Sequence, residues 1–249
     1  MIDIHCHIVP GVDDGSDDIA ESARMGEVAE ACGVTDIIVT PHCNIPGSYR
    51  NYFGPWYDRE FEGLKSLFSE HGINVKLHRG MEVFGTDDVA KLYDEGLVLT
   101  LAGSEFMLVE FDFGDDMWRV RDVLYSLFER KITPIIAHPE RYFPVQDDPY
   151  FALDWVKMGC LLQINRTSLL SHRSDPCYRT ARTLLDEAAV HFIATDSHGV
   201  FSRTTRLSDA YDFIMERYPA EWAEILMDEN PRRVIEHRRV RNLPRPEGY

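Results

Sequence analysis

The chain has 249 residues, of which 42 are acidic and 26 are lysine or arginine, so its net charge is -16. An excess of negative charge this large argues against a surface for nucleic acid or for an anionic membrane. The length suits one α/β domain, and we expect residues 1–249 to form a single domain with a loose tail from about residue 241.

The cysteine content predicts a cytoplasmic protein. There are five cysteines, an odd number, and they lack the spacing of a disulfide framework. Met1 leads directly into the first apolar run, with neither the basic nor the long apolar segment of a signal peptide. No apolar run approaches the roughly 20 residues that a membrane span requires, so we expect no membrane insertion.

Short apolar segments alternate with longer amphipathic ones, which predicts repeated β-α units. Seven such strands predict a distorted (β/α)7 barrel, a TIM-like α/β fold. The expected strands are 1–4, 36–40, 74–77, 106–111, 133–137, 160–164 and 191–195. The expected helices are about 19–32, 57–71, 86–95, 117–130, 152–158, 176–188 and 206–217, with a final helical pair through 235.

The end of the chain is its basic part. Asn230-Pro231 predicts an N-cap followed by a proline that opens the last helix. Pro244 and Pro246 suggest a loose end after it. We interpret this stretch as a solvated helix end and tail, with a docking patch as the alternative. Its arginines are Arg232, Arg233, Arg238, Arg239, Arg241 and Arg245.

Histidines and acids follow nearly all of the expected strands. In a β/α barrel these positions converge on one mouth, where the chemistry of such folds is found. Residues two apart in an extended segment share a face, and histidines or acids with this spacing follow both the first and the last strand. The candidates are His5, His7, His42, Glu82, Glu110, His138, Asp196 and His198, and Asp14 joins them from a loop.

These ligand types predict a catalytic metal cluster. Imidazole and carboxylate without thiolate suit manganese, iron or zinc better than they suit a structural zinc site. Nine candidates exceed what one ion needs, so we expect two or three divalent ions. A cluster of that kind favours hydrolysis of a phosphate ester.

Simpler interpretations exist for individual residues. His5 and His7 could be ordinary strand histidines, and Asp14 could belong to a turn before a helix capped by Asp17 or Asp18. Glu110 has no comparable alternative, because an unpaired carboxylate in an apolar strand is costly to bury. A cation would remove that cost.

Seven short motifs carry these candidates: IDIHCH at 2–7, VDDG at 12–15, TPH at 40–42, GME at 80–82, VEF at 109–111, AHPERY at 137–142 and TDSH at 195–198. In this order they resemble the PHP (polymerase and histidinol phosphatase) superfamily. Within it the chain looks most like the bacterial manganese-dependent protein-tyrosine phosphatases of capsular and extracellular polysaccharide operons. The similarity covers essentially the whole chain, and the ordered set is specific although each motif alone is not.

The resemblance implies a mechanism and a substrate. It implies manganese, with iron or zinc as alternatives, and a metal-bridged hydroxide that attacks phosphorus without a phosphoenzyme. The implied substrate is the phosphotyrosine-bearing tail of a bacterial tyrosine kinase that regulates capsular or extracellular polysaccharide synthesis. The implied ligand sets are His5, His7, Glu82 and Asp196 for one ion, Glu82, Glu110 and His138 for a second, and Asp14, His42 and His198 for a third.

Arg141 and Arg203 are the implied phosphate ligands, since a planar guanidinium can bond two phosphate oxygens. Arg141 could instead pair with its neighbour Glu140. Relatives commonly follow the second arginine with two prolines, whereas this chain continues Thr204-Thr205-Arg206. The choice between Arg203 and Arg206 therefore stays open.

Two further features have alternative interpretations. Aromatic residues after His42 could form a wall for a phosphotyrosine ring or could pack their own loop. Cys160 and Arg166 satisfy the C-x5-R pattern of cysteine-dependent tyrosine phosphatases, but that loop needs glycine and small polar residues to turn its N–H groups inward. The apolar residues between them predict a buried strand, so we interpret this match as coincidence. The aromatic residues are Tyr49, Tyr52, Phe53, Trp56 and Tyr57.

Three other functions are alternatives to tyrosine phosphatase activity. A small-molecule phosphatase such as a histidinol-phosphatase would use the same site. A non-catalytic protein could use it to bind phosphorylated tails. A nuclease or polymerase-editing role is disfavoured by the acidic charge and by the absence of an appended domain.

Overall fold

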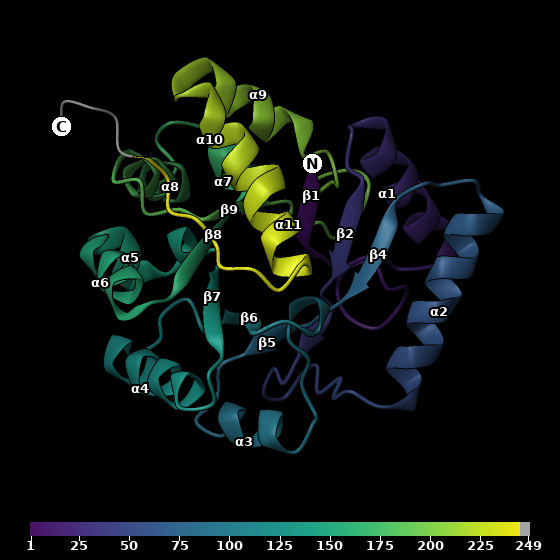
Figure 1. Cartoon of the computed structure of the whole chain (residues 1–249), viewed down its shortest axis with the longest axis horizontal. Helices are drawn as coiled ribbons and strands as arrows, with labels where there is room; N and C mark the ends of the chain where they lie inside the picture. The colour runs from purple at the N-terminus through teal and green to yellow at the C-terminus, as the bar shows by residue number, and fades with distance from the viewer. Residues whose placement is uncertain (245–249) are drawn as a thin grey trace.

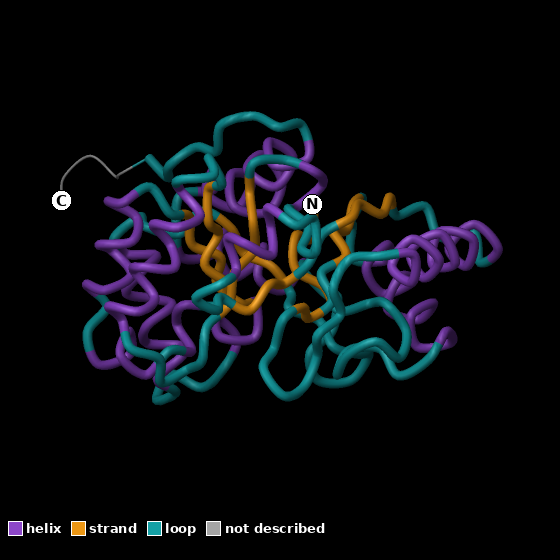
Figure 2. The backbone as a smooth tube through the Cα atoms, turned by 90° about the horizontal axis from the view of Figure 1, so that it is seen from below, coloured by secondary structure: helices purple, strands orange, loops and turns teal. Residues whose placement is uncertain are grey.

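The fold is a barrel of parallel strands with helices outside it, seen in a computed structural model that describes residues 1–244 (Figure 1). Viewed from below, the strands lie in the middle of the molecule with helices on both sides (Figure 2). Arg245 and Pro246 lie outside the described residues. The strands are β1 (Ile2–Cys6), β2 (Asp36–Val39), β3 (His42–Cys43), β4 (Lys76–Arg79), β5 (Glu82–Phe84), β6 (Phe106–Glu110), β7 (Thr133–Ala137), β8 (Leu161–Asn165) and β9 (Phe192–Ala194).

These strands form two sheets, of order β1-β2-β4 and β3-β5-β6-β7-β8-β9, which together make seven barrel strands. Two barrel strands are each interrupted, one at Pro41 between β2 and β3 and one at Gly80 between β4 and β5. The sequence did not predict β3 and β5, which have only 2 and 3 residues. The barrel closes between β1 and β9, where Asp196 N donates to His5 O at 2.9 Å. The predicted distorted (β/α)7 barrel is confirmed.

Helices follow the barrel strands and cover their outer faces (Figure 1). Asp18, rather than Asp17, caps the first helix, because its side chain accepts from Glu21 N at 2.8 Å. The helices are α1 (Ile19–Ala31), α2 (Pro55–Glu70), α3 (Val89–Asp94), α4 (Met117–Phe128), α5 (Phe143–Asp147), α6 (Tyr150–Met158), α7 (Arg166–Leu170), α8 (Pro176–Asp186), α9 (Ser208–Arg217), α10 (Ala220–Glu224) and α11 (Asn230–Ile235). Between them lie the 3-10 turns η1 (Leu101–Gly103) and η2 (Pro139–Arg141) and the π-helical turn η3 (Ile225–Glu229).

One end of the barrel interior is apolar and closed. Ile2 and Ile4 of β1 pack there against apolar side chains of the other barrel strands, and Val234 of α11 and Leu101 of η1 cover them. Each fully buried aliphatic side chain of this kind contributes about 1.5–3 kcal/mol. The apolar base leaves the opposite end of the barrel, at the carboxyl ends of the strands, for polar groups.

The last helical segment differs from the prediction at Asn230. This residue is not an N-cap, because its backbone is helical (φ -66°) and α10, η3 and α11 run on without a break. Its buried side chain instead donates to His191 O at 3.0 Å and to Arg241 O at 2.9 Å. The amide is thus used to tie the segment after α11 to the barrel, and Leu243 in that segment is also buried.

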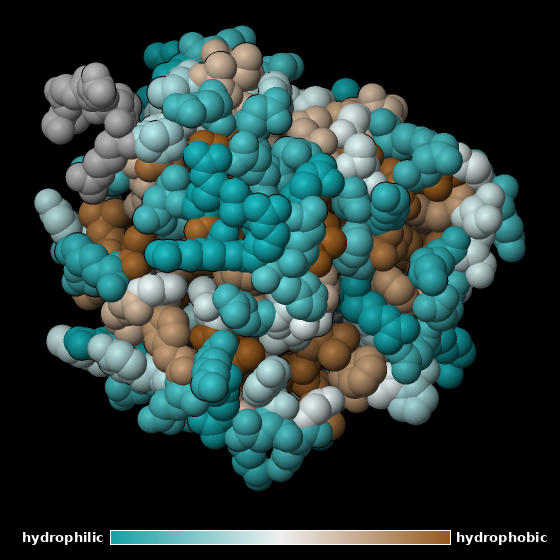
Figure 3. Space-filling model, in the orientation of Figure 1, coloured by the Kyte–Doolittle hydropathy of each residue, from teal (hydrophilic) through white to brown (hydrophobic). Residues whose placement is uncertain are grey.

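Three of the five described arginines of the basic stretch, Arg232, Arg238 and Arg241, pair with acids of the same segment. Arg232 lies 2.9 Å from Asp228, and Arg238 lies 2.9 Å from Glu236. On the face of the molecule seen in Figure 1, hydrophilic residues extend across the middle, over α11 (Figure 3). This pairing favours the solvated interpretation. Among the described residues, none of the helices has both the length and the apolar composition needed to cross a membrane.

His191 lies just before β9 and is buried in its neutral form. Its Nδ1 accepts from Leu162 N at 3.1 Å, and its Nε2 lies 3.2 Å from Asn242 Oδ1. Burial lowers the pKa of His191 from 6.5 to about 4, although the bond to Asn242 opposes the shift. Below pH 6.5 the unfolded chain therefore binds a proton that the folded chain does not. Acidification to pH 5 should cost about 2 kcal/mol of stability through this one residue.

We expect the variant His191→Asn to lose less stability between pH 7 and pH 5 than the wild type, because an Asn Oδ1 can still accept from Leu162 N but does not titrate. Urea unfolding at both pH values measures the two losses. A chelator in every sample prevents metal binding from contributing to the difference. The other histidines are present in both proteins, so their contribution cancels. Equal losses in the two proteins would contradict the prediction.

Candidate metal centre

The candidate ligands meet at the carboxyl ends of the barrel strands. His5 and His7 come from the end of β1, and Glu82 and Glu110 come from β5 and β6. His138 directly follows β7, and Asp196 is the second residue after β9. Both have left-handed backbones, with φ of 35° and 49°. A residue with a Cβ rarely adopts this conformation, and such strain is concentrated at functional sites. The surrounding structure therefore holds these two side chains in place.

The ligand atoms form three adjacent groups, and the atoms within each group all lie within 4.8 Å of one another. The first two groups share Glu82, and His7 belongs to the first and the third. His138 stands beside them, with Nε2 2.9 Å from Glu82 Oε1. The groups are His5, His7, Glu82 and Asp196; His42, Glu82 and Glu110; and His7, Asp14, His42 and His198. The structure thus brings together all nine candidates. The resemblance implied His42 only for the third ion, whereas here it also belongs to the group with Glu82 and Glu110.

Several buried atoms of this cluster have no hydrogen-bond partner among the described residues. His42 Nδ1, for example, lies 3.0 Å from Glu82 Oε2 but is not aligned for a hydrogen bond. A buried polar atom without a partner costs about 1–3 kcal/mol. Cations would satisfy these atoms, so the residues fit divalent metal ions. The unpartnered atoms that belong to the three groups are His42 Nδ1, Glu82 Oε2, Glu110 Oε1, Asp196 Oδ1 and His198 Nε2.

The carboxylates of the cluster strongly favour positive charge on their neighbours. Burial opposes protonation of His5 and His42, but the nearby acids outweigh it and raise the pKa of His5 to about 9 and that of His42 to about 12. Burial likewise opposes ionisation of Glu82, yet the imidazoles hold its pKa well below the usual value. Protons must therefore leave when cations bind, which favours metal binding at higher pH.

Three of the histidines are oriented through Nδ1. This atom lies 2.8 Å from Gln163 Oε1 in His5, 2.8 Å from Asp13 Oδ2 in His7 and 3.0 Å from the Asp196 carbonyl in His198. In each case Nε2 is turned into the cluster. An acceptor on Nδ1 of this kind typically fixes a metal-binding histidine.

Two kinds of supporting residue were missed from the sequence. Asp13 holds His7 and also accepts from His42 N at 2.8 Å, and its place in the VDDG motif beside Asp14 was a signal. Gly15 is required there, because a Cβ would lie 2.2 Å from His7 O. Gln163 and Asn165 are buried amides two apart on β8, and that spacing could have placed both inside the barrel.

The two predicted phosphate arginines lie beside the cluster. Arg141 lies 3.4 Å from Asp196 Oδ2, and Arg203 also pairs with that oxygen. Glu140, the alternative partner of Arg141, is buried and accepts from Asn165 N at 2.8 Å instead. Both arginines line a hollow of about 250 Å³ that also contains Asn165. A phosphate in this hollow would meet two guanidinium groups.

The loop after His198 places Arg203, and not Arg206, at this hollow. The carbonyl of Arg203 accepts from His198 N at 2.9 Å and from Ser197 Oγ at 2.8 Å. Thr205 Oγ1 donates to Met25 O at 2.7 Å and so ties the loop to α1. Arg206 is exposed. A threonine thus anchors this loop although the two prolines are missing.

Most of the aromatic residues after His42 pack against the apolar core. Tyr57 is buried and donates to Gly80 O at 2.9 Å, and Trp56 Nε1 donates to Tyr52 O at 2.6 Å. Tyr49 differs, because its ring stacks on His42 with centroids 5.8 Å apart. Phe201, in the loop between His198 and Arg203, is 93% exposed.

The C-x5-R match has no phosphate-binding geometry. Cys160 and Arg166 flank the extended strand β8, and burial raises the pKa of the Cys160 thiol well above its usual value. Arg166 pairs with Asp209 at 2.5 Å. The interpretation of this match as coincidence agrees with the structure.

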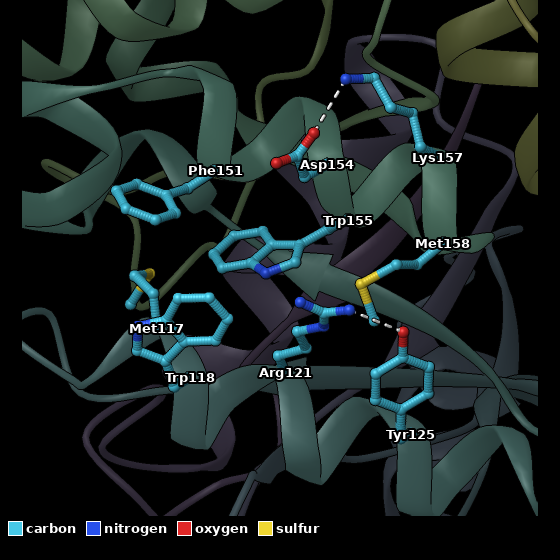
Figure 4. A pocket seen from close by; sticks show the side chains of 9 residues that line it. All are labelled: Met117, Trp118, Arg121, Tyr125, Phe151, Asp154, Trp155, Lys157 and Met158. Atoms are coloured by element: carbon cyan, nitrogen blue, oxygen red, sulfur yellow. Dashed lines mark hydrogen bonds and ion pairs between the residues drawn. The ribbon is translucent and has the colours of Figure 1, made fainter.

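A second hollow, of about 430 Å³, lies between α4 and α6, apart from the cluster. Figure 4 shows its aromatic walls, which include Trp118 and Trp155, with Arg121 between Trp118 and Tyr125. Its acid, Asp154, pairs with Lys157 at 2.8 Å. None of the nine candidate ligands lines it, so we do not assign the chemistry to this hollow.

Comparison with known proteins identifies the relatives of the chain. Residues 1–236 match the family described as capsular polysaccharide synthesis, CpsB/CapC. The chain is 29% identical to the tyrosine-protein phosphatase YwqE of Bacillus subtilis, over 99% of this chain and 96% of the relative. It is 30% identical to the tyrosine-protein phosphatase CpsB of Streptococcus pneumoniae, over 94% of this chain and 98% of the relative.

Solved structures agree with the sequence matches. The fold superposes with a TM-score of 0.91, at 27% identity and over 98% of both chains, on a structure from a study of YwqE and CpsB as metal-dependent tyrosine phosphatases. A phosphotriesterase homology protein of Escherichia coli has a TM-score of 0.62 at 12% identity, covering 94% of this chain and 98% of its own. The second similarity concerns the barrel fold alone.

Proposed function

Because the chain belongs to the CpsB/CapC family of capsular polysaccharide synthesis, we propose that it is a metal-dependent phosphatase that hydrolyses phosphotyrosine in proteins. The observation that carries the proposal is the gathering of nine histidine and acid side chains around shared carboxylates, with two arginines beside them. The relatives named tyrosine-protein phosphatases match nearly the whole chain, which supports the same reaction here. The match over residues 1–236 also supports one catalytic domain.

The three groups of ligand atoms would hold two or three divalent ions. Ions bound there supply Lewis acidity and lower the pKa of water. We propose manganese, with iron or zinc as alternatives, because imidazole and carboxylate ligands suit all three. Glu82 holds neighbouring groups together, and Asp13 and Gln163 keep His7 and His5 turned toward them.

The arginines would bind the phosphate group of the substrate. Arg141 and Arg203 both pair with Asp196 Oδ2, which places the two guanidinium groups side by side. Phosphate oxygens accept bidentate bonds from guanidinium groups and gain negative charge during transfer. Tyr49 and Phe201 offer apolar surface for the phenyl ring, which favours phosphotyrosine over a phosphate ester without an aromatic ring.

The substrate that we propose is the phosphotyrosine-bearing tail of a bacterial tyrosine kinase that regulates polysaccharide synthesis. The family description and the names of the relatives support this context. We also propose a cytoplasmic location, which agrees with five cysteines that form no disulfide. The hollow lined by Arg141 and Arg203 and the exposed side chain of Phe201 would be available to a flexible peptide.

Phosphate release from a panel of substrates tests the proposal. We expect the manganese-loaded protein to hydrolyse a phosphotyrosine peptide with a kcat/KM at least tenfold above that for histidinol phosphate, because only the peptide places a phenyl ring on the aromatic surface. A chelator should abolish both activities, and manganese should restore them. Preference for histidinol phosphate would favour the small-molecule phosphatase.

The variant His42→Ala separates catalysis from binding. It should release no phosphate while its circular dichroism stays that of the wild type, because His42 belongs to two of the three groups but to no apolar core. A wild type that binds the peptide yet stays inactive with every metal would favour the non-catalytic binding protein.

A further inference from the structure

β8 is the barrel strand with no candidate metal ligand on it or just after its carboxyl end, and it presents two amides to the cluster instead. Leu162 and Ile164 face outward into the core under the helices. Their neighbours Gln163 and Asn165 face inward and are 0% and 2% exposed. Buried amides are costly unless all of their polar atoms are bonded, so the bonds of these two side chains need an explanation.

The two amides form a chain of hydrogen bonds between two candidate ligands. Asn165 Nδ2 donates to Asp196 Oδ2 at 2.6 Å, and Gln163 Nε2 donates to Asn165 Oδ1 at 2.8 Å. Gln163 Oε1 then lies 2.8 Å from His5 Nδ1. Asn165 is itself held by its backbone, whose N–H donates to Glu140 Oε1 at 2.8 Å.

The direction of this chain is fixed at one end. An ionised carboxylate only accepts hydrogen bonds, so Asn165 must turn its NH2 group toward Asp196. Its oxygen then accepts from Gln163, and the oxygen of Gln163 must face His5. Reversing both amides would place the Asn165 oxygen against the carboxylate, where two acceptors repel. His5 Nδ1 therefore carries a proton, so when the ring is neutral, as it must be to bind a metal ion, the lone pair is on Nε2.

We propose that Gln163 and Asn165 are positioning residues. Because Asp196 can only accept, both amides are oriented with their oxygens toward His5, and this orientation fixes the tautomer of His5 that can bind a metal ion. His5 Nε2 lies 3.2 Å from Glu82 Oε1 and 3.3 Å from Asp196 Oδ1, so it is turned into the first ligand group. Asp196 is oriented by the same chain, because Asn165 holds Oδ2 and leaves Oδ1 facing the cluster. The proposal needs a metal site but no particular reaction.

The test compares two substitutions of Gln163 that have similar size. Gln163→Met removes both the acceptor and the donor, whereas Gln163→Glu keeps an acceptor for His5. We expect Gln163→Met to bind Zn²⁺ about 10–100-fold more weakly than the wild type, as is typical when the partner of a metal-bound histidine is lost. Gln163→Glu should bind Zn²⁺ nearly as well as the wild type. Competition with a chromophoric chelator measures both affinities on the full chain.

For thermal stability we expect the opposite order, with Gln163→Met more stable than Gln163→Glu. A methionine fits a buried apolar strand, whereas an additional carboxylate there is costly. A residue with only a structural role would therefore show the weaker metal binding in Gln163→Glu. Gln146→Met is the matched control, because Gln146 bonds Glu140 O and no candidate ligand, and its Zn²⁺ affinity should equal that of the wild type.

Nuclear magnetic resonance of the Zn²⁺-loaded wild type tests the direction of the chain without any variant. With ¹⁵N-labelled histidine, His5 should show a protonated, slowly exchanging Nδ1 and a zinc-bound Nε2. Zinc on Nδ1 would overturn the proposal, and so would equal Zn²⁺ affinities in Gln163→Met, Gln163→Glu and the wild type. Should Gln163→Met fail to fold, this spectrum and the affinity of Gln163→Glu still decide. Activity on phosphotyrosine is not used, so failure here is separate from failure of the proposed function.

Discussion

The variant Glu82→Gln should lose both its metal and its activity. Four imidazoles surround this one buried carboxylate, with His138 and His5 at 2.9 and 3.2 Å from Oε1 and His42 and His7 at 3.0 and 3.1 Å from Oε2. Glu82 also belongs to two of the three ligand groups. Removing one member of a buried charge cluster costs about 3–5 kcal/mol, which corresponds to about 10²–10⁴ in affinity.

We therefore expect kcat/KM for a phosphotyrosine peptide to fall by about 10³-fold, because the glutamine keeps the shape of the side chain but not the charge that holds the cations. Elemental analysis should find less manganese per chain after purification. Asp36→Asn is the matched control, since Asp36 is a buried acid that pairs with His78 at 2.8 Å on β2 and β4. That control should keep its metal and its activity.

A Glu82→Gln protein with wild-type metal content and activity would mean that the cations do not bind at the groups described here. Loss of metal in both Glu82→Gln and Asp36→Asn would point instead to general loss of the fold. Unfolding curves for both variants distinguish these outcomes.

The sequence predicted the barrel because its strands and helices are long enough to show their periodicity. β3 and β5 were missed for the opposite reason: each has at most three residues and continues a barrel strand beyond Pro41 or Gly80. Local pattern cannot distinguish such short strands from loops. They matter for function, because His42 and Glu82 are the first residues of β3 and β5 and are paired across the sheet.

The candidate ligands could be found from the sequence because parallel strands in a barrel end at one mouth. Their partners are harder to find. Gln163 matters through a contact with His5, 158 residues away, and Asn165 through a contact with Asp196, 31 residues away. The role of Asn230 depends in the same way on His191 and Arg241, so the Asn-Pro pattern misled the prediction of a cap. Contacts of this kind are a property of the assembled barrel and not of any local segment.

The Arg203 loop shows how the structure narrows a choice that the sequence left open. Three donors hold the carbonyl of Arg203, from His198 N, Gly199 N and Ser197 Oγ at 2.9, 3.2 and 2.8 Å. Its side chain also donates from Nε to Asp196 O at 3.0 Å. Arg206 has no such anchor among the described residues and is exposed. The geometry therefore favours Arg203 as the arginine that would meet a phosphate.

We expect Arg203→Ala to lower kcat/KM for a phosphotyrosine peptide by about 10²–10³-fold, the usual effect of removing one donor to a developing oxyanion. Metal content should stay that of the wild type, because Arg203 is not a candidate ligand. Arg203→Lys should recover only part of the loss, since an ammonium cannot form the paired bonds of a guanidinium. Arg206→Ala is the matched control and should retain wild-type kinetics. A large loss in Arg206→Ala with an active Arg203→Ala would reverse the assignment, and it would mean that the loop rearranges when substrate binds.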